Sequence, residues 1–236
     1  MNPSLPAPGT QLRPKHSRCF RVAVLCALGC LAACRSTTTA PDAPPPVRLK
    51  SVLVLPFKNM AAVYGPNLSV RCPLCGNVFT TGKVENGASN LLTEHLVAKL
   101  KAREGLEVIT SEEARGDLST LLAGGGRELS EHDRALEAGR RMQTEGVIAG
   151  YVYRFSDRVG AKYSVESPAS VTFDFDLIQV SDGRLLWSGA FDETQKPLFE
   201  DLFQLGTFLR RGGAWLTAAQ LAQLGLDDIL ATLDFL

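Results

Sequence analysis

The folded part of the chain opens with the stretch Ser51-Val52-Leu53-Val54-Leu55-Pro56-Phe57. A continuous apolar run of this kind is typical of a central strand that is buried on both faces. Proline has no backbone N–H to donate to a sheet, so Pro56 is expected to end the strand. The stretch therefore predicts a sheet at the centre of the fold, and the other elements are interpreted around it.

Hydrophobic periodicity predicts the elements that follow this strand. Apolar residues at helical spacing indicate a helix over about residues 85–103, and a short strand follows at 106–109. Ser130 is placed to cap a second helix, which gives way to a strand at 147–155. Residues 60–83 are rich in Gly, Pro, Asn and Thr and are interpreted as a long connection.

Two more strands are predicted at residues 170–180 and 184–191, joined at Asp182-Gly183, a strong hairpin signal. In the first of them, apolar residues alternate with polar ones that include Asp174 and Asp176, which predicts one buried and one solvated face.

Helices are expected from residue 197 and from Thr217, where Thr217 and Gln220 match a capping box. The order of elements predicts an α/β (α+β) fold in which a mixed sheet of about five strands is covered by helices.

A secretory signal precedes this domain. The first 33 residues carry four basic side chains and no acidic one, and residues 22–33 are mostly apolar but too few to span a bilayer. The stretch Leu31-Ala32-Ala33-Cys34 resembles the lipobox of bacterial lipoproteins, in which Cys34 would become the lipidated amino terminus, modified by acyl chains such as palmitate. The alternative is an ordinary secreted protein, since three more cysteines lie in the signal.

The residues after Cys34 predict a tether. Residues 35–46 are rich in Ser, Thr, Ala and Pro, and at about 3.1 Å each they would reach roughly 35 to 40 Å from the membrane. Position 35 is Arg rather than Asp, which by resemblance to enterobacterial lipoproteins implies the outer membrane. The expected organisation is a signal peptide at 1–33, a flexible tether at 34–50 and a single periplasmic domain at 51–236.

The net charge argues against a nucleic-acid partner. The chain has 25 basic and 25 acidic side chains, and removal of residues 1–33 takes away four basic residues, which leaves a charge near −4. Such a balance provides no electrostatic surface for nucleic acid.

The sharpest chemical motif is Arg71-Cys72-Pro73-Leu74-Cys75-Gly76, which looks like one knuckle of a zinc ribbon. A closed zinc site needs four ligands, and the predicted domain has no second cysteine pair. His95, His132 or a symmetry mate would then complete the set. In an oxidising compartment the alternative is a disulfide or a pair of plain thiols, so no cofactor is expected unless zinc binds Cys72 and Cys75.

Other candidate residues are weaker. Asp174 and Asp176 lie on one strand face about 7 Å apart, where they would either hold a cation or act as an acid pair, although alternating acids are commoner on a solvated face. The chain contains no phosphate-binding loop, no nucleophile elbow and no His-Glu-x-x-His motif. No catalytic residue is assigned, and the protein is not expected to be an enzyme.

Three strand motifs resemble a known group of envelope proteins. These are Val52-Leu53-Val54-Leu55-Pro56-Phe57-Lys58-Asn59, Gly146-Val147-Ile148-Ala149-Gly150-Tyr151-Val152 and Asp182-Gly183-Arg184-Leu185-Leu186-Trp187-Ser188. They resemble the opening strand, central strand and late hairpin of proteins related to the curli-secretion lipoproteins. The same core occurs in lipoprotein activators of penicillin-binding proteins and in the amino-terminal domain of the Tol-system propeller protein.

The resemblance covers most of residues 51–195 and implies a fold and a compartment. We predict an outer-membrane lipoprotein that faces the periplasm, with the membrane and other envelope proteins as its partners. Its expected function is that of a protein-binding accessory factor in envelope assembly, secretion or cell-wall maintenance. Two alternatives remain: metal or thiol handling by Cys72 and Cys75, and a homo-oligomeric scaffold. The helix that begins at Thr217 would either dock a partner or close the domain's own core.

Overall fold

The computed structural model describes residues 48–113, 129–161, 164–195 and 215–233. Its main sheet contains, in spatial order, β10 (Leu185–Thr194), β9 (Ser170–Gln179), β6 (Gly146–Ser156), β1 (Ser51–Val54) and β5 (Glu107–Thr110), with β2 (Lys58–Asn59) paired to β6. The pairs β1–β5, β1–β6 and β2–β6 are parallel, whereas β6–β9 and β9–β10 are antiparallel. The predicted mixed α/β sheet is confirmed.

Strand β1 lies inside the sheet, as its apolar sequence predicts. Val52, Leu53 and Val54 are almost completely buried because helices cover both faces. The strand ends before Pro56, and the chain then pairs with β6 a second time through β2.

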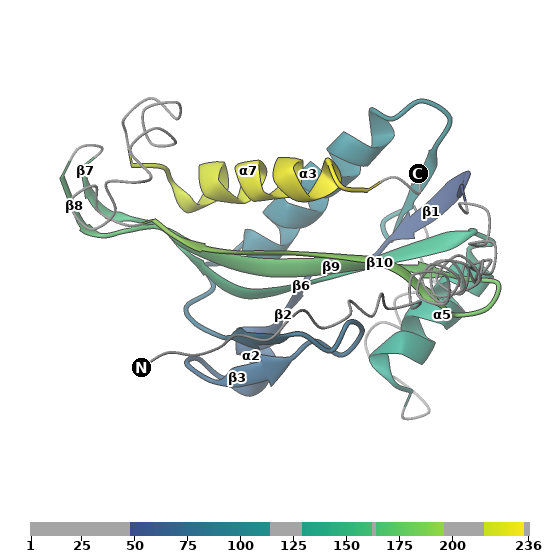
Figure 1. The fold of residues 1–236 in the computed structure, drawn as a ribbon, viewed down its shortest axis with the longest axis horizontal. Helices are drawn as coiled ribbons and strands as arrows, with labels where there is room; N and C mark the ends of the chain where they lie inside the picture. The colour runs from purple at the N-terminus through teal and green to yellow at the C-terminus, as the bar shows by residue number, and fades with distance from the viewer. Residues whose placement is uncertain (1–47, 114–128, 162–163, 196–214, 234–236) are drawn as a thin grey trace, which may run out of the picture. The chain divides into compact units, whose positions relative to one another are not determined.

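Helices α3 (Ala88–Lys101) and α7 (Ala218–Leu230) cover one face of the sheet (Figure 1). Helix α3 buries Leu92, Leu96 and Leu100 on one side, at the predicted spacing. Helix α7 begins with the predicted capping box, in which Thr217 and Gln220 each accept a backbone N–H of the other. Its buried side chains pack against β9, β10 and α3, so this helix closes the domain's own core.

The other face is covered in two parts. Helix α5 (Glu131–Arg141) packs over β1 and β6, and Ser130 caps it by accepting the backbone N–H of Asp133. Beside it lie α2 (Met60–Tyr64), β3 (Ser69–Arg71) and β4 (Val78–Thr80), which pack on the far end of β6 (Figure 1).

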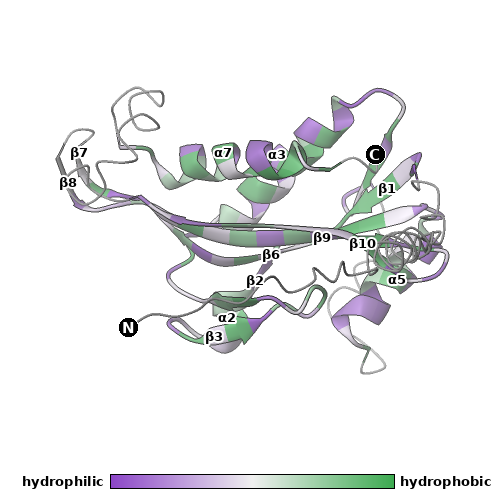
Figure 2. Ribbon diagram, viewed as in Figure 1, coloured by the Kyte–Doolittle hydropathy of each residue, from purple (hydrophilic) through white to green (hydrophobic). Residues whose placement is uncertain are grey.

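Two expectations about this face are wrong. Residues 60–83 are not a plain connection, because they hold α2 and the β3–β4 hairpin, whose elements of three to five residues are too short to show periodicity. Strand β9 has no solvated face either. Its residues alternate between hydrophobic and hydrophilic (Figure 2), yet Asp174 and Asp176 expose none of their surface because the β3–β4 hairpin covers them.

The predicted turn between β9 and β10 is present at Asp182-Gly183, with Gly183 at a positive φ of 75°. A second hairpin, β7 (Val159–Ala161) with β8 (Ser164–Ser167), was not predicted. The helix expected from residue 197, the signal with Cys34 and residues 34–47 of the expected tether lie outside the described residues. The last three residues of that tether are described, and among them Leu49 is buried in the core. Among the helices that are described, none has the length and apolar character needed to cross a membrane.

We expect Leu221→Ala to lower the free energy of unfolding by about 2 to 5 kcal/mol, because it opens a cavity in a fully buried position of α7. Leu224→Ala, the same change at a partly exposed position of the same helix, should have a smaller effect. Urea denaturation of the exported mature chain measures both variants. Equal losses would contradict the packing of α7 onto the sheet.

Candidate metal centre

The motif from Arg71 to Gly76 forms the tip of the β3–β4 hairpin. The Cys72 N–H donates to the Asn77 carbonyl at 2.7 Å, and the Gly76 N–H donates to the Cys72 carbonyl at 3.1 Å. Gly76 has a φ of 78°, a conformation that glycine adopts without strain. This tight turn leaves Cys72 buried and Cys75 partly buried, both as free thiols.

The two thiols meet the two aspartates of β9. The Cys72 Sγ donates to Asp176 Oδ2 at 3.3 Å, and the Cys75 Sγ donates to Asp174 Oδ2 at 3.4 Å. One ligand atom from each of the four residues can be chosen so that all four lie within 4.8 Å of one another. The structure thus joins the cysteine pair to the acid pair, which the sequence suggested only as separate candidates.

Polar side chains of the neighbouring strands surround this cluster. The Tyr153 hydroxyl on β6 donates to Asp174 Oδ1 at 3.3 Å, and its ring stacks on Phe79 of the hairpin with 4.4 Å between centroids. Ser188 on β10 lies opposite Asp176 in the sheet register. Among the described residues, neither Ser188 Oγ nor Asp176 Oδ1 has a hydrogen-bond partner, although both atoms are buried.

Burial dominates the acid–base properties of the cluster. It raises the pKa of the Cys72 thiol far above the ordinary value, and the nearby charges of Asp174 and Asp176 raise it further. It also raises the pKa of Asp174 to about 7, against the opposing effect of the nearby Cys72 thiol and of the hydrogen bonds donated by Cys75 and Tyr153. The pKa values of Cys75 and Asp176 are raised for the same main reason.

No cation of the described chain balances these acidic groups. The ion pairs found among residues 48–113, 129–161, 164–195 and 215–233 include neither Asp174 nor Asp176. Two sulfur and two oxygen atoms therefore converge in a buried space that no Lys, Arg or His of the described chain neutralises. Such a set of atoms can hold a divalent metal ion.

The two histidines considered as further ligands lie elsewhere. His95 is on α3, across the sheet from the cysteines, and its ring contacts the Gln223 side chain at 3.3 Å. His132 is on α5 and contacts the Gly183 carbonyl oxygen at 2.8 Å. Neither belongs to the group that surrounds Cys72 and Cys75, so this expectation is replaced by one in which Asp174 and Asp176 are the partners.

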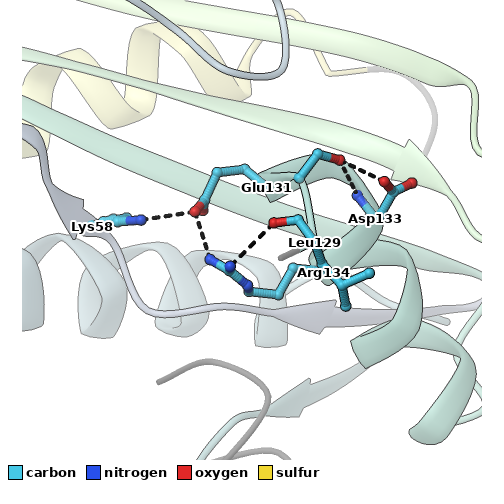
Figure 3. Close-up of polar contacts among 6 residues, drawn as sticks. Lys58, Leu129, Glu131, Asp133 and Arg134 are labelled. Atoms are coloured by element: carbon cyan, nitrogen blue, oxygen red, sulfur yellow. Dashed lines mark hydrogen bonds and ion pairs between the residues drawn. The ribbon is translucent and has the colours of Figure 1, made fainter. Parts of the chain in front are cut away.

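A second hollow lies beside the cluster, on the same face of the sheet. It is a cleft of about 260 Å³ between the end of β1 and helix α5, next to Tyr151. Figure 3 shows the Glu131 carboxylate between the Lys58 ammonium group, at 2.8 Å, and the Arg134 guanidinium group, at 2.7 Å. The charges at this cleft are thus paired with one another.

No protein-family model matches the chain, and no curated protein sequence matches it. Its structure is similar to that of the PelC dodecamer from Paraburkholderia phytofirmans, with 16% identity, a TM-score of 0.46 and coverage of 81% of this chain and 92% of that one. It is also similar to the LpoB C-terminal domain from Salmonella enterica, with 17% identity, a TM-score of 0.38 and coverage of 64% and 87%.

A third similar structure is lipoprotein GNA1162 from Neisseria meningitidis, with 13% identity, a TM-score of 0.38 and coverage of 70% of this chain and 96% of that one. The solved structures that this chain resembles thus include LpoB and a lipoprotein, GNA1162.

We expect the stability of the metal-free, reduced protein relative to its Asp174→Asn variant to fall as the pH rises from about 4 to 7. The native state holds a proton on Asp174 up to about pH 7, whereas the unfolded state releases it near pH 3.8. One such proton gives a slope of at most about 1.4 kcal/mol per pH unit. Urea denaturation at several pH values measures the difference, and a difference independent of pH would contradict the burial of this carboxyl group.

Proposed function

We propose that this chain is a lipid-anchored envelope protein that faces the periplasm, is held in the outer membrane through Cys34, and acts as a protein-binding accessory factor in envelope assembly, secretion or cell-wall maintenance. The observation that carries the proposal is the lipobox Leu31-Ala32-Ala33-Cys34 behind a basic leader. Several acyl chains on one cysteine anchor a protein more firmly than a single chain does, because each buried CH₂ contributes about 0.8 kcal/mol.

Protein binding is supported by the surface of the layer that contains α2 and the β3–β4 hairpin. Of the six large hydrophobic residues that are exposed in the described chain, four lie in this layer: Val63, Tyr64, Leu68 and Val78. Tyr64 exposes 53% of its surface, and the others expose similar fractions. Exposed apolar residues that gather in one part of a surface are typical of sites where another protein binds.

Two further observations support this assignment over the alternatives. Helix α7 uses its apolar side for the core, which leaves the hairpin layer as the better candidate for binding a partner. The thiols and carboxylates of the candidate metal centre lie between the hairpin and the sheet, a position that suits a structural role more than chemistry on a substrate. We therefore propose that the protein is not an enzyme.

We expect cells supplied with labelled palmitate to incorporate the label into this protein, and we expect Cys34→Ala to abolish incorporation. The reason is that the thioether to Cys34 is the attachment point for the lipid in the lipobox interpretation. Cys30→Ala, a change to another cysteine of the same leader, should leave incorporation intact. Label that persists in the Cys34→Ala protein would contradict the anchor.

We expect a photo-crosslinking amino acid at Tyr64 to attach one dominant envelope protein in intact cells. The same group at Leu185, which is exposed on β10 outside the hairpin layer, should attach little of it. The product should also decrease strongly in Cys34→Ala, which lacks the anchor, and in Val63→Lys, which places a charge on the apolar surface. Mass spectrometry of the crosslinked material identifies the protein.

The crosslinks also separate the proposal from its alternative. Attachment of only further copies of this chain would contradict an accessory role and favour a homo-oligomeric scaffold. Equal attachment of the same protein at Tyr64 and Leu185 would contradict the assignment of the binding surface to the hairpin layer.

A further inference from the structure

We infer that Cys72, Cys75, Asp174 and Asp176 form a four-coordinate zinc site that fastens the β3–β4 hairpin to strand β9. The site is inferred without reference to the proposed partner binding, because its ligands lie on β9 and on the buried side of the hairpin. Its role is structural, since all four ligands come from the protein and the ion has no open position for a substrate.

The first reason is the unbalanced burial of acidic groups. Asp174 and Asp176 expose none of their surface, and no described Lys, Arg or His forms an ion pair with either. A buried carboxyl group that stays ionised must be paired with a charge, fully hydrogen-bonded or bound to a metal; otherwise it takes up a proton, as Asp174 does in the metal-free protein below about pH 7. Asp176 Oδ1 accepts no hydrogen bond of normal geometry from a described residue, and the nearby Ser188 hydroxyl only approaches this carboxyl group, so hydrogen bonding does not complete the site.

The second reason is the geometry of the four ligand atoms. In tetrahedral zinc sites the Zn–S distance is about 2.3 Å and the Zn–O distance about 2.0 Å, which places neighbouring sulfur and oxygen ligands about 3.5 Å apart. The sulfur-to-oxygen distances between hairpin and strand are 3.3 Å for Cys72 with Asp176 and 3.4 Å for Cys75 with Asp174. These two distances match that spacing, and all four ligand atoms lie within 4.8 Å of one another, so only a small contraction of the cluster would be needed to hold one zinc ion.

The third reason is the way in which the hairpin presents its sulfurs. The Cys72 N–H donates to the Asn77 carbonyl at 2.7 Å and the Gly76 N–H donates to the Cys72 carbonyl at 3.1 Å, which closes the turn between the two cysteines. Both sulfurs consequently lie against β9, each in contact with one of its two aspartates. On binding, each thiol releases its proton to solvent, as does the Asp174 carboxyl group where it is protonated, and the ion would then occupy the space between the four ligand atoms.

The ligand types select the metal. Calcium and magnesium are bound by oxygen ligands and do not take thiolates, whereas copper(I) prefers a set made only of soft sulfur ligands. Zinc accepts both thiolate and carboxylate in a tetrahedral arrangement. A mixed set of two sulfurs and two oxygens therefore fits zinc better than the other common ions.

A disulfide between the cysteines would serve this site less well. Cys72 and Cys75 donate the hydrogen bonds that reach Asp176 Oδ2 and Asp174 Oδ2. A disulfide has no S–H, so both bonds would be lost while the carboxylates stayed covered by the hairpin. Removal of a buried partner leaves the remaining polar group without compensation.

The test uses the full chain, extracted from membranes in detergent without a chelator. We expect about one zinc ion per chain by elemental mass spectrometry, and a cobalt(II)-substituted protein with thiolate-to-cobalt charge-transfer absorption. Asp176→Asn and Cys75→Ser should each weaken zinc binding by about tenfold or more. The matched control is Asp192→Asn, since Asp192 is an aspartate of the neighbouring strand that is bound by Arg154 instead.

A measurement on the unmutated protein covers the case in which a variant fails to fold. Chelation should increase amide hydrogen exchange in residues 69–80 while α3 stays protected, and added zinc should reverse the change. Three results would overturn the inference: less than stoichiometric zinc with no cobalt spectrum, a Cys72–Cys75 disulfide in protein isolated without reductant, or removal of zinc with no change in hairpin exchange.

Discussion

The fold depends on the burial of β9 on both of its faces. On one face Phe173 and Phe175 pack with Phe57 beneath α3 and α7, which is ordinary apolar packing. On the other face Asp174 and Asp176 are covered by the hairpin that carries the cysteines. Apolar packing tolerates small shifts, but a buried carboxylate requires its hydrogen-bonding or charged partners at fixed positions. The acid pair thus specifies where the hairpin lies, and through it the place of the exposed residues of α2 and β4.

Local signals explain which parts of the fold the sequence predicted. Helices α3, α5 and α7 follow from apolar spacing and from caps such as Ser130 and Thr217, and the β9–β10 turn follows from its Asp-Gly pair. Helix α2 and strands β3 and β4 are too short for any period to appear. Their position depends on contacts with β6, and no local pattern in the chain encodes those contacts.

The sequence predicts the cysteine half of the candidate site but not its aspartate half. Cysteine spacing identified Cys72 and Cys75, but the alternation in β9 was assigned to solvent, since a solvated face and a buried face that binds polar groups have the same period of two. Residue type alone suggests His95 and His132, besides a symmetry mate, as the remaining ligands, yet α3 and α5 direct both side chains elsewhere. The apolar sequence of β6 is the signal that could have revealed the buried acids. A strand buried on both faces needs neighbouring strands that are covered as well, which predicts that both faces of β9 are buried.

The contact between Cys72 and Asp176 joins positions that are 104 residues apart. A contact of this span forms only after the intervening helices and strands have been placed, because closing a long loop is slow compared with forming local structure. Before this contact forms, β9 does not cover the two thiols, and after it forms Cys72 is almost inaccessible to solvent. Resistance of Cys72 to alkylation therefore distinguishes a chain that has assembled its whole sheet from one that has stopped before β9.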